Sequence, residues 1–167
     1  MPNLVYLSLG SNIGDREAQL RRAQVQLGAP GRVLAVSSFY ETEPVEFTEQ
    51  PWFVNCSVAL ETSRTPLELM SEILSIEQEM GRRREQNQGP QNKGPRSIDI
   101  DILLFADQII DSKNLTVPHP AMHQRRFVLE PLAEIAPEIQ HPLLHKTIRE
   151  LRDALPPGQL VRRISQE

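Results

Sequence analysis

The order in which hydrophobic periodicity changes along residues 4–105 restricts this chain more than any other feature. Apolar residues alternate at a period of two, then recur at spacings of three and four, in the order strand, helix, strand, strand, helix, strand. This order predicts an α+β fold with a ferredoxin-like βαββαβ core, in which helices cover one face of an antiparallel sheet and leave the other available. The predicted strands are residues 4–9, 33–40, 53–62 and 97–105, and the predicted helices are 15–28 and 65–81.

Local signals mark the ends of these helices. Asp15 is a suitable N-cap for the first helix, and Thr65 with Glu68 forms a capping box at the start of the second. Gly81 predicts the end of the second helix. Beyond residue 105 the pattern predicts a C-terminal extension with helices at 125–135 and 147–155, and we expect the tail after Pro142 to be structural.

Acidic and apolar residues alternate along the predicted strand 97–105. Ile98, Ile100, Ile102 and Leu104 share one parity, whereas Asp99 and Asp101 have the other. Because successive side chains of a strand point to opposite faces, the isoleucines and Leu104 are expected in the core and both aspartates on the open face. The same argument places Phe53 and Asn55 together on one surface of their strand.

Two carboxylates two residues apart on a strand lie roughly 6 to 7 Å from each other. They can share one hard cation or bridge two, and oxygen ligands favour Mg²⁺ over Zn²⁺. A bare Asp-x-Asp pair is also common on a solvated strand face, so the pair alone leaves both interpretations open.

Cationic residues and a polar segment precede this pair and favour the metal interpretation. Residues 84–95 contain no apolar residue except two prolines and are a candidate lid. This segment begins with Arg84 and lies between Arg82 and Arg96. Arginine binds phosphate oxygens bidentately and stays charged. A metal site, cationic side chains that clamp phosphate and a segment that covers them together indicate phosphoryl transfer. Taken alone, arginines at a helix end are more often solvated than part of a ligand site.

Composition excludes several other classes of protein. The 167 residues suit one domain, so we expect a single domain over 1–167. A formal net charge of −4 argues against a general nucleic-acid binder, and no apolar run approaches the roughly 20 residues that span a bilayer. A lone cysteine suits a reducing compartment, so we expect a cytoplasmic protein. Cys56 alternates with Val54 and Val58, which predicts a buried structural thiol.

Five segments of the chain together resemble one enzyme family. They read LGSN at 9–12, SSFYET at 37–42, QPWFVN at 50–55, GPRSIDIDILLF at 94–105, and VPH at 117–119 continuing to RRF at 125–127. These segments closely resemble the 6-hydroxymethyl-7,8-dihydropterin pyrophosphokinases of folate synthesis. The resemblance extends to about Pro142, and its Gly-Pro-Arg-x-x-Asp-x-Asp run is highly specific.

The resemblance implies a reaction and a set of residues. The hydroxymethyl oxygen of the pterin would attack the β-phosphorus of ATP, giving the pterin diphosphate and AMP. Asp99 and Asp101 would hold two Mg²⁺ ions, Arg82 and Arg96 would stabilise the moving charge, and no general base would be essential beyond assistance from Asp99. The implied pterin site is Thr42, Pro44, Val45, Phe53, Asn55 and Phe127, and the implied ATP site is Glu77, Arg82, Arg84, Arg96, Ile102, Thr116, His119 and Arg125. The expected partners are therefore ATP and a small pterin, with no nucleic acid or membrane, and the expected state is a monomer.

Two other readings of the same residues remain. A nucleotidyltransferase also pairs Gly-Ser with Asp-x-Asp, but in that class the two motifs lie close together, whereas here Gly10-Ser11 is far from Asp99. A non-catalytic ligand-binding or RNA-binding module can use the same kind of sheet. Such a module is expected to expose aromatic residues on its strands, without an acid pair among them.

Overall fold

The computed structural model describes residues 2–43, 51–85 and 98–164, and the side chains of these residues other than 82–85. Strands, helices and one 3₁₀ segment follow one another along the chain. They are β1 (Asn3–Ser11), α1 (Arg16–Gln26), β2 (Arg32–Val36), β3 (Tyr40–Thr42), β4 (Phe53–Thr62), α2 (Pro66–Glu85), β5 (Asp99–Phe105), β6 (Ile110–Asp111), β7 (Thr116–Val117), η1 (Met122–Gln124), α3 (Arg126–Ile135), α4 (Ile148–Asp153) and β8 (Val161–Arg163).

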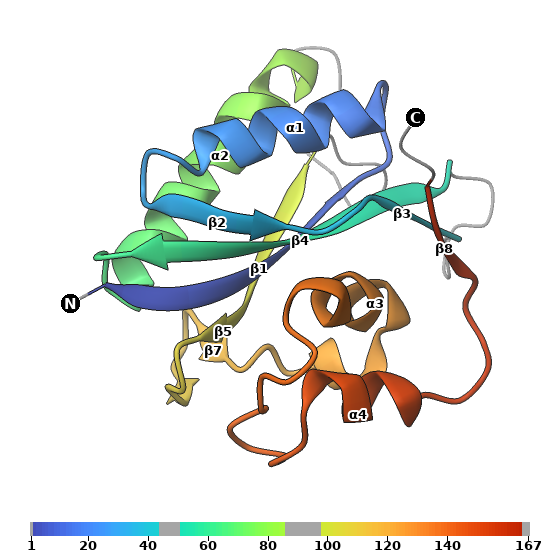
Figure 1. The fold of residues 1–167 in the computed structure, drawn as a ribbon. Coiled ribbons are helices and arrows are strands. Elements are labelled where there is room, and N and C mark those ends of the chain that lie inside the picture. Colours follow the sequence, from blue (N-terminus) through green and yellow to red (C-terminus); the bar gives the residue numbers. More distant parts are fainter. Residues whose placement is uncertain (1, 44–50, 86–97, 165–167) are drawn as a thin grey trace.

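The larger sheet has the strand order β5-β1-β4-β3-β8, and β2 pairs with β4. Every pair in it is antiparallel. Helices α1 and α2 lie on one face of the sheet, and α3 and α4 lie on the other (Figure 1). The predicted combination of helices with an antiparallel sheet is confirmed. The expectation that the second face stays available holds only beyond the part that α3 and α4 cover.

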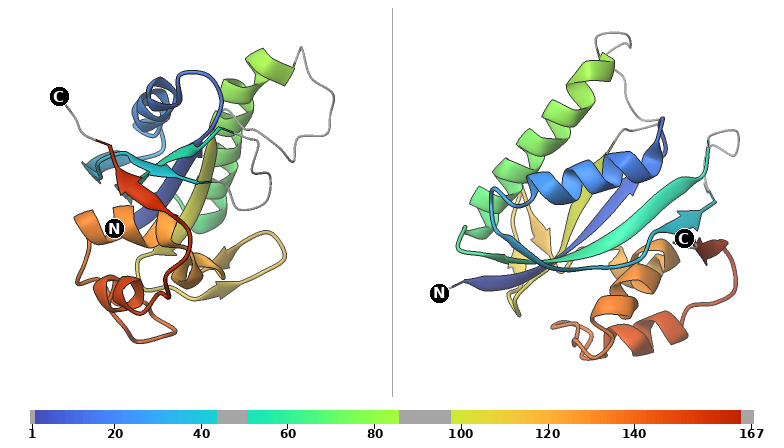
Figure 2. Two further views of the ribbon diagram at one scale, coloured as in Figure 1. Left: turned by 90° about the vertical axis from the view of Figure 1, so that its right-hand side faces the viewer. Right: turned by 45° about the horizontal axis from the view of Figure 1, so that its top comes forward.

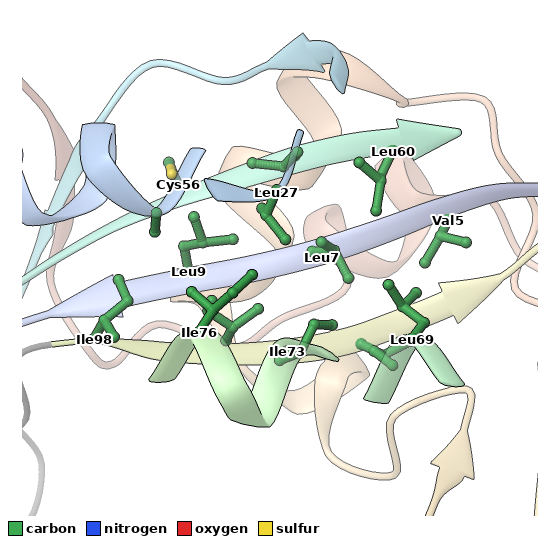
Figure 3. Close-up of a cluster of buried hydrophobic side chains, with 14 of the residues drawn as sticks. Val5, Leu7, Leu9, Leu27, Cys56, Leu60, Leu69, Ile73, Ile76 and Ile98 are labelled. Carbon is green, nitrogen blue, oxygen red and sulfur yellow. The ribbon is translucent and has the colours of Figure 1, made fainter. Parts of the chain in front are cut away.

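Two apolar clusters hold these layers together. Alternate residues of β1, among them Leu7 and Leu9, pack with Ile73 and Ile76 of α2 in the first cluster (Figure 3). The residues of opposite parity serve the other face, where Tyr6 lies in the second cluster with side chains of α3 and α4. The period of two in β1 therefore builds both halves of the core.

The predicted helix starts are confirmed, but one predicted end is wrong. The carboxylate of Asp15 accepts a hydrogen bond from Ala18 N at 3.1 Å, and Thr65 and Glu68 form the capping box. Helix α2 continues through Gly81 to Glu85. An interior glycine costs a helix only about 1 kcal/mol relative to alanine, and the arginines that follow are good helix formers favoured near a helix C-terminus.

No helix in the described part of the chain is long and apolar enough to cross a membrane.

The strand predicted over 33–40 is two strands, β2 and β3. Between them the side chain of Ser37 takes part in the ladder: its Oγ accepts a hydrogen bond from Ser57 N at 2.8 Å and donates to Ser38 O at 2.7 Å. Serine hydroxyls compete with backbone groups for hydrogen bonds, which interrupts a regular strand at this point.

Strand β5 contains an irregularity that overturns one predicted core position. Its register against β1 shifts between Tyr6 and Leu7, so that Tyr6 pairs with Leu104 and Leu7 pairs with Ile102. Because the extra residue reverses the parity of the strand, Leu104 packs in the second cluster and Phe105 in the first. Leu104 therefore does not share the core face of the isoleucines.

Cys56 lies in the first cluster and is buried, as predicted for a structural thiol. Burial raises the pKa of the Cys56 thiol to about 12, against a smaller lowering by the hydrogen bond from Gln24 Nε2 to its Sγ at 3.5 Å. The thiol is consequently protonated near neutral pH and is a poor nucleophile.

Between α3 and α4, His141 is only 3% exposed. Its Nδ1 accepts hydrogen bonds from the backbone N–H groups of Leu143 and Leu144, at 3.2 and 3.1 Å. Burial, and then the neighbouring His123 and His145, lower the pKa of His141 from its usual 6.5. The folded protein therefore holds this ring neutral at a pH where the unfolded chain takes up a proton.

We expect His141 to make folding weaker in mild acid. A lowered folded pKa means that its contribution is fully present above about pH 6.5 and is lost as the pH falls from there toward the folded pKa, at up to about 1.4 kcal/mol per pH unit. Urea unfolding at pH 7.5, 6.5 and 5.5 measures this loss. His141→Asn, whose side-chain oxygen can accept the same bonds and does not titrate, should flatten the pH dependence. The exposed His145→Asn removes only the smallest of the three causes that lower the pKa of His141, so it should reduce the pH dependence much less. A slope in His141→Asn equal to that of wild type would contradict the assignment.

Candidate active site

Two rows of residues cross the central strands β4, β1 and β5 on the face opposite α1 and α2. In the first row Gly10 pairs with Asn55 on one side and Asp99 on the other. In the second row Ser8 pairs with Ser57 and Asp101. Residues in register across antiparallel strands share a face, so the two aspartates and Asn55 project from one polar surface. This surface begins where the apolar row around Tyr6, which α3 covers, ends.

A cavity of about 160 Å³, here called the aromatic cavity, opens on this polar surface. It combines two phenyl rings, a carboxamide and both aspartates, and it draws on β1, β3, β4, β5, α3 and the segments beside β3, α3 and β8. Its lining residues are Ser8, Gly10, Thr42, Glu43, Phe53, Asn55, Asp99, Asp101, Arg125, Phe127 and Gln159.

Two polar atoms in this lining lack a hydrogen-bond partner among the described residues. They are Thr42 Oγ1 and Asn55 Oδ1, in side chains that are 2% and 4% exposed. A buried polar atom left unpaired costs about 1 to 3 kcal/mol, so such atoms usually mark strain, an ordered water or a ligand site. Here both atoms belong to the same cavity, which favours a polar ligand.

Gly10 allows the side chain of Asn55 to lie across β1. A Cβ built on Gly10 would come within 2.7 Å of Asn55 Nδ2, closer than real Cβ contacts. The absence of a side chain at residue 10 thus creates the space that the carboxamide uses. This is a close approach of the kind for which a strand glycine is required.

A second cavity, of about 290 Å³, lies between α2, β5 and the segment around β7, and is here called the α2 cavity. Asp99 and Asp101 line it as well, so the two aspartates border both cavities. Its lining residues are Met70, Ile73, Leu74, Glu77, Asp99, Ile100, Asp101, Ile102, Asn114, Leu115, Thr116, His119 and Pro120.

Glu77 connects α2 to the strand that carries the aspartates. Its Oε2 accepts a hydrogen bond from Ile100 N at 2.7 Å, and Ile100 lies between Asp99 and Asp101. This bond holds the backbone of β5 in place between the two residues that carry the carboxylates.

His119 enters the α2 cavity from the segment after β7. Its backbone N–H donates to Leu103 O at 3.0 Å, and its Nδ1 accepts from Ala121 N at 3.1 Å. Burial and the charge of Arg125 lower the pKa of His119, against a smaller raising by Asp99. In the neutral ring Nδ1 is the acceptor, so Nε2 carries the proton and is the available donor.

Helix α3 supplies Phe127, and Glu134 on the same helix holds α3 to the sheet. Glu134 accepts hydrogen bonds from Tyr40 Oη at 2.7 Å and from Ser38 N and Oγ at 2.9 and 3.1 Å. Burial alone would raise the pKa of Glu134, but these bonds outweigh it and the pKa is lowered. The carboxylate therefore stays ionised and holds α3, the helix that carries Phe127, against Tyr40 of β3 and against Ser38.

Most predicted site residues that the structure describes fall into the two cavities. Thr42, Phe53, Asn55 and Phe127 line the aromatic cavity, and Glu77, Ile102, Thr116 and His119 line the α2 cavity. Both sets meet at Asp99 and Asp101, and their ligand assignments stay predictions.

Arg125 is the exception to this division. It was expected with the ATP residues, yet it lines the aromatic cavity, with its guanidinium 5.6 Å from the centre of the Phe127 ring. Pro44, Val45 and Arg96 lie outside the described residues, as do the side chains of Arg82 and Arg84.

Several lining residues were not predicted from the sequence. Ser8 and Gly10 share the parity of Tyr6 in β1, and that alternation could have placed them beside the aspartates. Glu43, Asn114 and Gln159 carry no such signal, because loops and the C-terminal strand bring them to the cavities.

The chemistry of the aspartate pair fits Mg²⁺. Both carboxylates are partly buried and come from one strand face, and Mg²⁺ in proteins is commonly held by one or two carboxylates together with phosphate oxygens and water. Within residues 2–43, 51–85 and 98–164, no group of three or more histidine, cysteine, aspartate or glutamate side chains could hold a metal.

Comparisons with known proteins point to one family. The model of the family described as 7,8-dihydro-6-hydroxymethylpterin-pyrophosphokinase (HPPK) matches residues 6–137. The 2-amino-4-hydroxy-6-hydroxymethyldihydropteridine pyrophosphokinase of Bacillus subtilis is 47% identical over 142 residues, which cover 84% of this chain and 82% of the relative. The protein of the same name in Methylorubrum extorquens is 44% identical over 159 residues, 94% of this chain and 96% of the relative.

Longer proteins contain a similar segment. The folic acid synthesis protein fol1 of Schizosaccharomyces pombe is 43% identical over 155 residues, so 92% of this chain matches only 20% of that protein. The crystal structure of wild-type Plasmodium falciparum HPPK-DHPS with pterin and p-hydroxybenzoate superimposes with a TM-score of 0.69 at 20% identity. The superposition covers 92% of this chain and 43% of that one, and at this identity it bears on the fold alone.

Proposed function

The chain belongs to the 7,8-dihydro-6-hydroxymethylpterin-pyrophosphokinase family, and on this premise we propose that it transfers diphosphate from ATP to 6-hydroxymethyl-7,8-dihydropterin in folate biosynthesis. The hydroxymethyl oxygen of the pterin attacks the β-phosphorus of ATP. The bond from the β-phosphorus to the oxygen that bridges it to the α-phosphate breaks, and AMP leaves while the pterin keeps the diphosphate. The proton of the hydroxymethyl group is released to water.

One observation carries this proposal: Asp99 and Asp101 border two cavities of different character. Transfer between two substrates needs an acceptor site and a donor site that meet at the reacting atoms. The aromatic cavity suits a flat heterocycle, and the α2 cavity suits a nucleotide. The aspartates stand at their common border, where the hydroxymethyl group and the β-phosphate have to meet.

The aromatic cavity is the proposed pterin site. Phe53 and Phe127 offer ring faces, and Asn55 can donate to and accept from the pyrimidine edge of a pterin. The unpaired oxygens of Thr42 and Asn55 support a ligand that donates hydrogen bonds here. We also assign Pro44 and Val45, which lie outside the described residues, to the pterin site.

The α2 cavity is the proposed site of ATP. Its lining combines apolar side chains such as Ile102 with Thr116, Glu77 and His119, as a nucleoside with a polyphosphate requires. The Nε2 donor of a neutral His119 suits a phosphate oxygen. We assign Arg82, Arg84 and Arg96 to the polyphosphate, and Arg125, which lines the aromatic cavity, to the side of the phosphates nearest the pterin.

We assign the metal site to Asp99 and Asp101, which hold two Mg²⁺ ions when ATP is bound. Bound there, Mg²⁺ neutralises phosphate charge and orients the polyphosphate. The residues of the chain then act by position: Asn55 orients the pterin, Glu77 fixes the strand of the aspartates through Ile100, and the arginines stabilise charge as the β-phosphate moves.

The same proposal extends to the organisation of the chain. We assign residues 1–167 to a single pyrophosphokinase domain that acts as a cytoplasmic monomer. The strand order, with β1 between β5 and β4, supports a ferredoxin-like core with a C-terminal extension formed by α3, α4 and β8.

The test is to identify every product formed from ATP, Mg²⁺ and 6-hydroxymethyl-7,8-dihydropterin. We expect AMP and the pterin diphosphate in equal amounts, and no product when EDTA replaces Mg²⁺. Chromatography of the nucleotides with mass spectrometry of the pterin measures both. Formation of ADP would indicate ordinary kinase chemistry instead, and release of free diphosphate with a nucleotide attached to the pterin would indicate a nucleotidyltransferase.

A further inference from the structure

Gln159 lines the aromatic cavity although it lies far beyond residue 137, where the match to the family model ends. It is partly buried and lies two residues before the start of the last strand, β8. Its Nε2 donates a hydrogen bond to the backbone oxygen of Glu43 at 2.7 Å, and Glu43 lines the same cavity. A residue of the C-terminal tail and a residue after β3 thus form one side of the cavity together.

Further bonds hold this side in place. Glu43 N donates to Leu160 O at 3.1 Å, and Leu160 N donates to the Glu43 carboxylate at 3.0 Å. The two segments continue as an antiparallel pair, in which Thr42 is opposite Val161 and Tyr40 is opposite Arg163. Figure 2 shows β8 beside β3 at the edge of the sheet. Thr42, with its unpaired Oγ1, is therefore fixed by the strand that follows Gln159.

Arg162 adds a second connection on the outer side of β3. Its Nε and Nη2 both donate to Glu41 Oε1, at 3.1 and 2.9 Å, and its guanidinium lies 5.2 Å from the centre of the Trp52 ring. Arg16 also binds Glu41 and donates to the Trp52 backbone oxygen. Since Trp52 directly precedes Phe53, this arrangement ties the tail to two of the segments that carry cavity residues, 40–43 and 52–55.

We propose that residues 159–163, here called the C-terminal wall, set the affinity of the aromatic cavity for its heterocyclic substrate. Gln159 faces the ligand, and Arg162 acts as a positioning residue through Glu41 and Trp52. The inference rests on the proposed function, because it takes the pterin as the occupant of this cavity. It adds a part of the chain that lies beyond residue 137, where the match to the family model ends.

The chemistry of Gln159 suits this role. One N–H of its carboxamide is engaged by Glu43, and a carboxamide has a second N–H and a carbonyl oxygen. It can therefore offer a donor and an acceptor to a pterin that already meets the carboxamide of Asn55. Replacing Gln159 also removes one of the hydrogen bonds between Glu43 and the tail. The change therefore removes a contact to the ligand and weakens the position of Glu43 in the cavity.

The experiment measures steady-state AMP formation with 6-hydroxymethyl-7,8-dihydropterin and ATP each varied in turn. Gln159→Ala should raise KM for the pterin about tenfold, the effect expected for one lost hydrogen bond, with kcat and KM for ATP within about twofold of wild type. Arg162→Ala should raise KM for the pterin about threefold in the same pattern, because it acts only through support. Thermal unfolding shows whether either variant is destabilised.

Gln140→Ala is the matched control. Its carboxamide also donates to a backbone oxygen, that of His145 at 3.2 Å, but it lies between α3 and α4 and lines neither cavity. An unchanged KM for the pterin in Gln159→Ala would overturn the inference. An equal rise in KM for the pterin and KM for ATP, together with a lower melting temperature, would also overturn it, because that result indicates that Gln159 only stabilises the fold. If the wild-type protein forms no AMP from ATP in the presence of the pterin, the proposed function itself fails. That outcome differs from an active wild-type protein whose variants show an unchanged KM, which would overturn only this inference.

Discussion

Replacing Asp101 with alanine should lower kcat for AMP formation at least about 100-fold while the protein stays folded. Asp101 projects from β5 onto the polar surface, opposite Ser8 of β1, and borders both cavities. Its removal takes one of two carboxylates from the proposed Mg²⁺ site at the place where the substrates meet. Because the side chain is only partly buried and no residue of the first apolar cluster changes, thermal unfolding should differ little from wild type.

Asp111→Ala is the control for this variant. Asp111 is also a strand aspartate, in β6, but it is exposed and lines neither cavity. Its kcat and its dependence on Mg²⁺ concentration should match wild type. In Asp101→Ala the activity that remains should require a higher Mg²⁺ concentration. Near-normal turnover at wild-type Mg²⁺ would refute the metal assignment.

Gly10→Ala is expected to raise KM for the pterin about 10- to 100-fold, since it disturbs a buried polar group that the ligand needs. The new Cβ would meet Asn55 Nδ2 at 2.7 Å, so the carboxamide has to move from its position over β1. Phe53 Cδ1, at 3.8 Å from the same Cβ, is in ordinary contact and can stay. KM for ATP should change little, because Gly10 does not line the α2 cavity.

A double-mutant cycle separates this explanation from a direct clash with substrate. If the Cβ acts by displacing Asn55, then Gly10→Ala should add no further loss in an Asn55→Ala background. An additive loss would contradict the mechanism. Gly158→Ala is the matched control, because a Cβ there meets no atom within 4 Å. Its KM for the pterin should remain that of wild type.

The features that the sequence predicted well are those that depend on near neighbours along the chain. The capping box at Thr65 and Glu68 spans four residues, and it formed as expected. The shared face of Asp99 and Asp101 follows from the period of two, and the structure places both on one surface. The period of two fails beyond Ile102 of β5, where the bulge moves Leu104 to the second cluster. A bulge is a property of strand pairing and leaves no clear signal in one strand alone.

The composition of each cavity was predictable only in part. The resemblance to a known family named residues from both cavities, but Arg125 lies with the aromatic residues instead of those of the α2 cavity. Gln159 was not identified, because the tail was interpreted as structural. Its hydrogen bond to Glu43 joins residues more than a hundred positions apart, and only the pairing of β8 with β3 creates that contact.

By itself, the sequence determined which residues share a face of a strand and where helices start, because period and capping are local properties of the backbone. It also identified the family and the acid pair. The tertiary structure decided that the aspartates border two cavities and that Gly10 makes room for Asn55. It also decided that α3 covers one end of the sheet and that Gln159 of the C-terminal tail lines the aromatic cavity. These depend on strand register and on packing between distant segments, which minimise buried unpaired polar groups and exposed apolar surface for the whole chain at once.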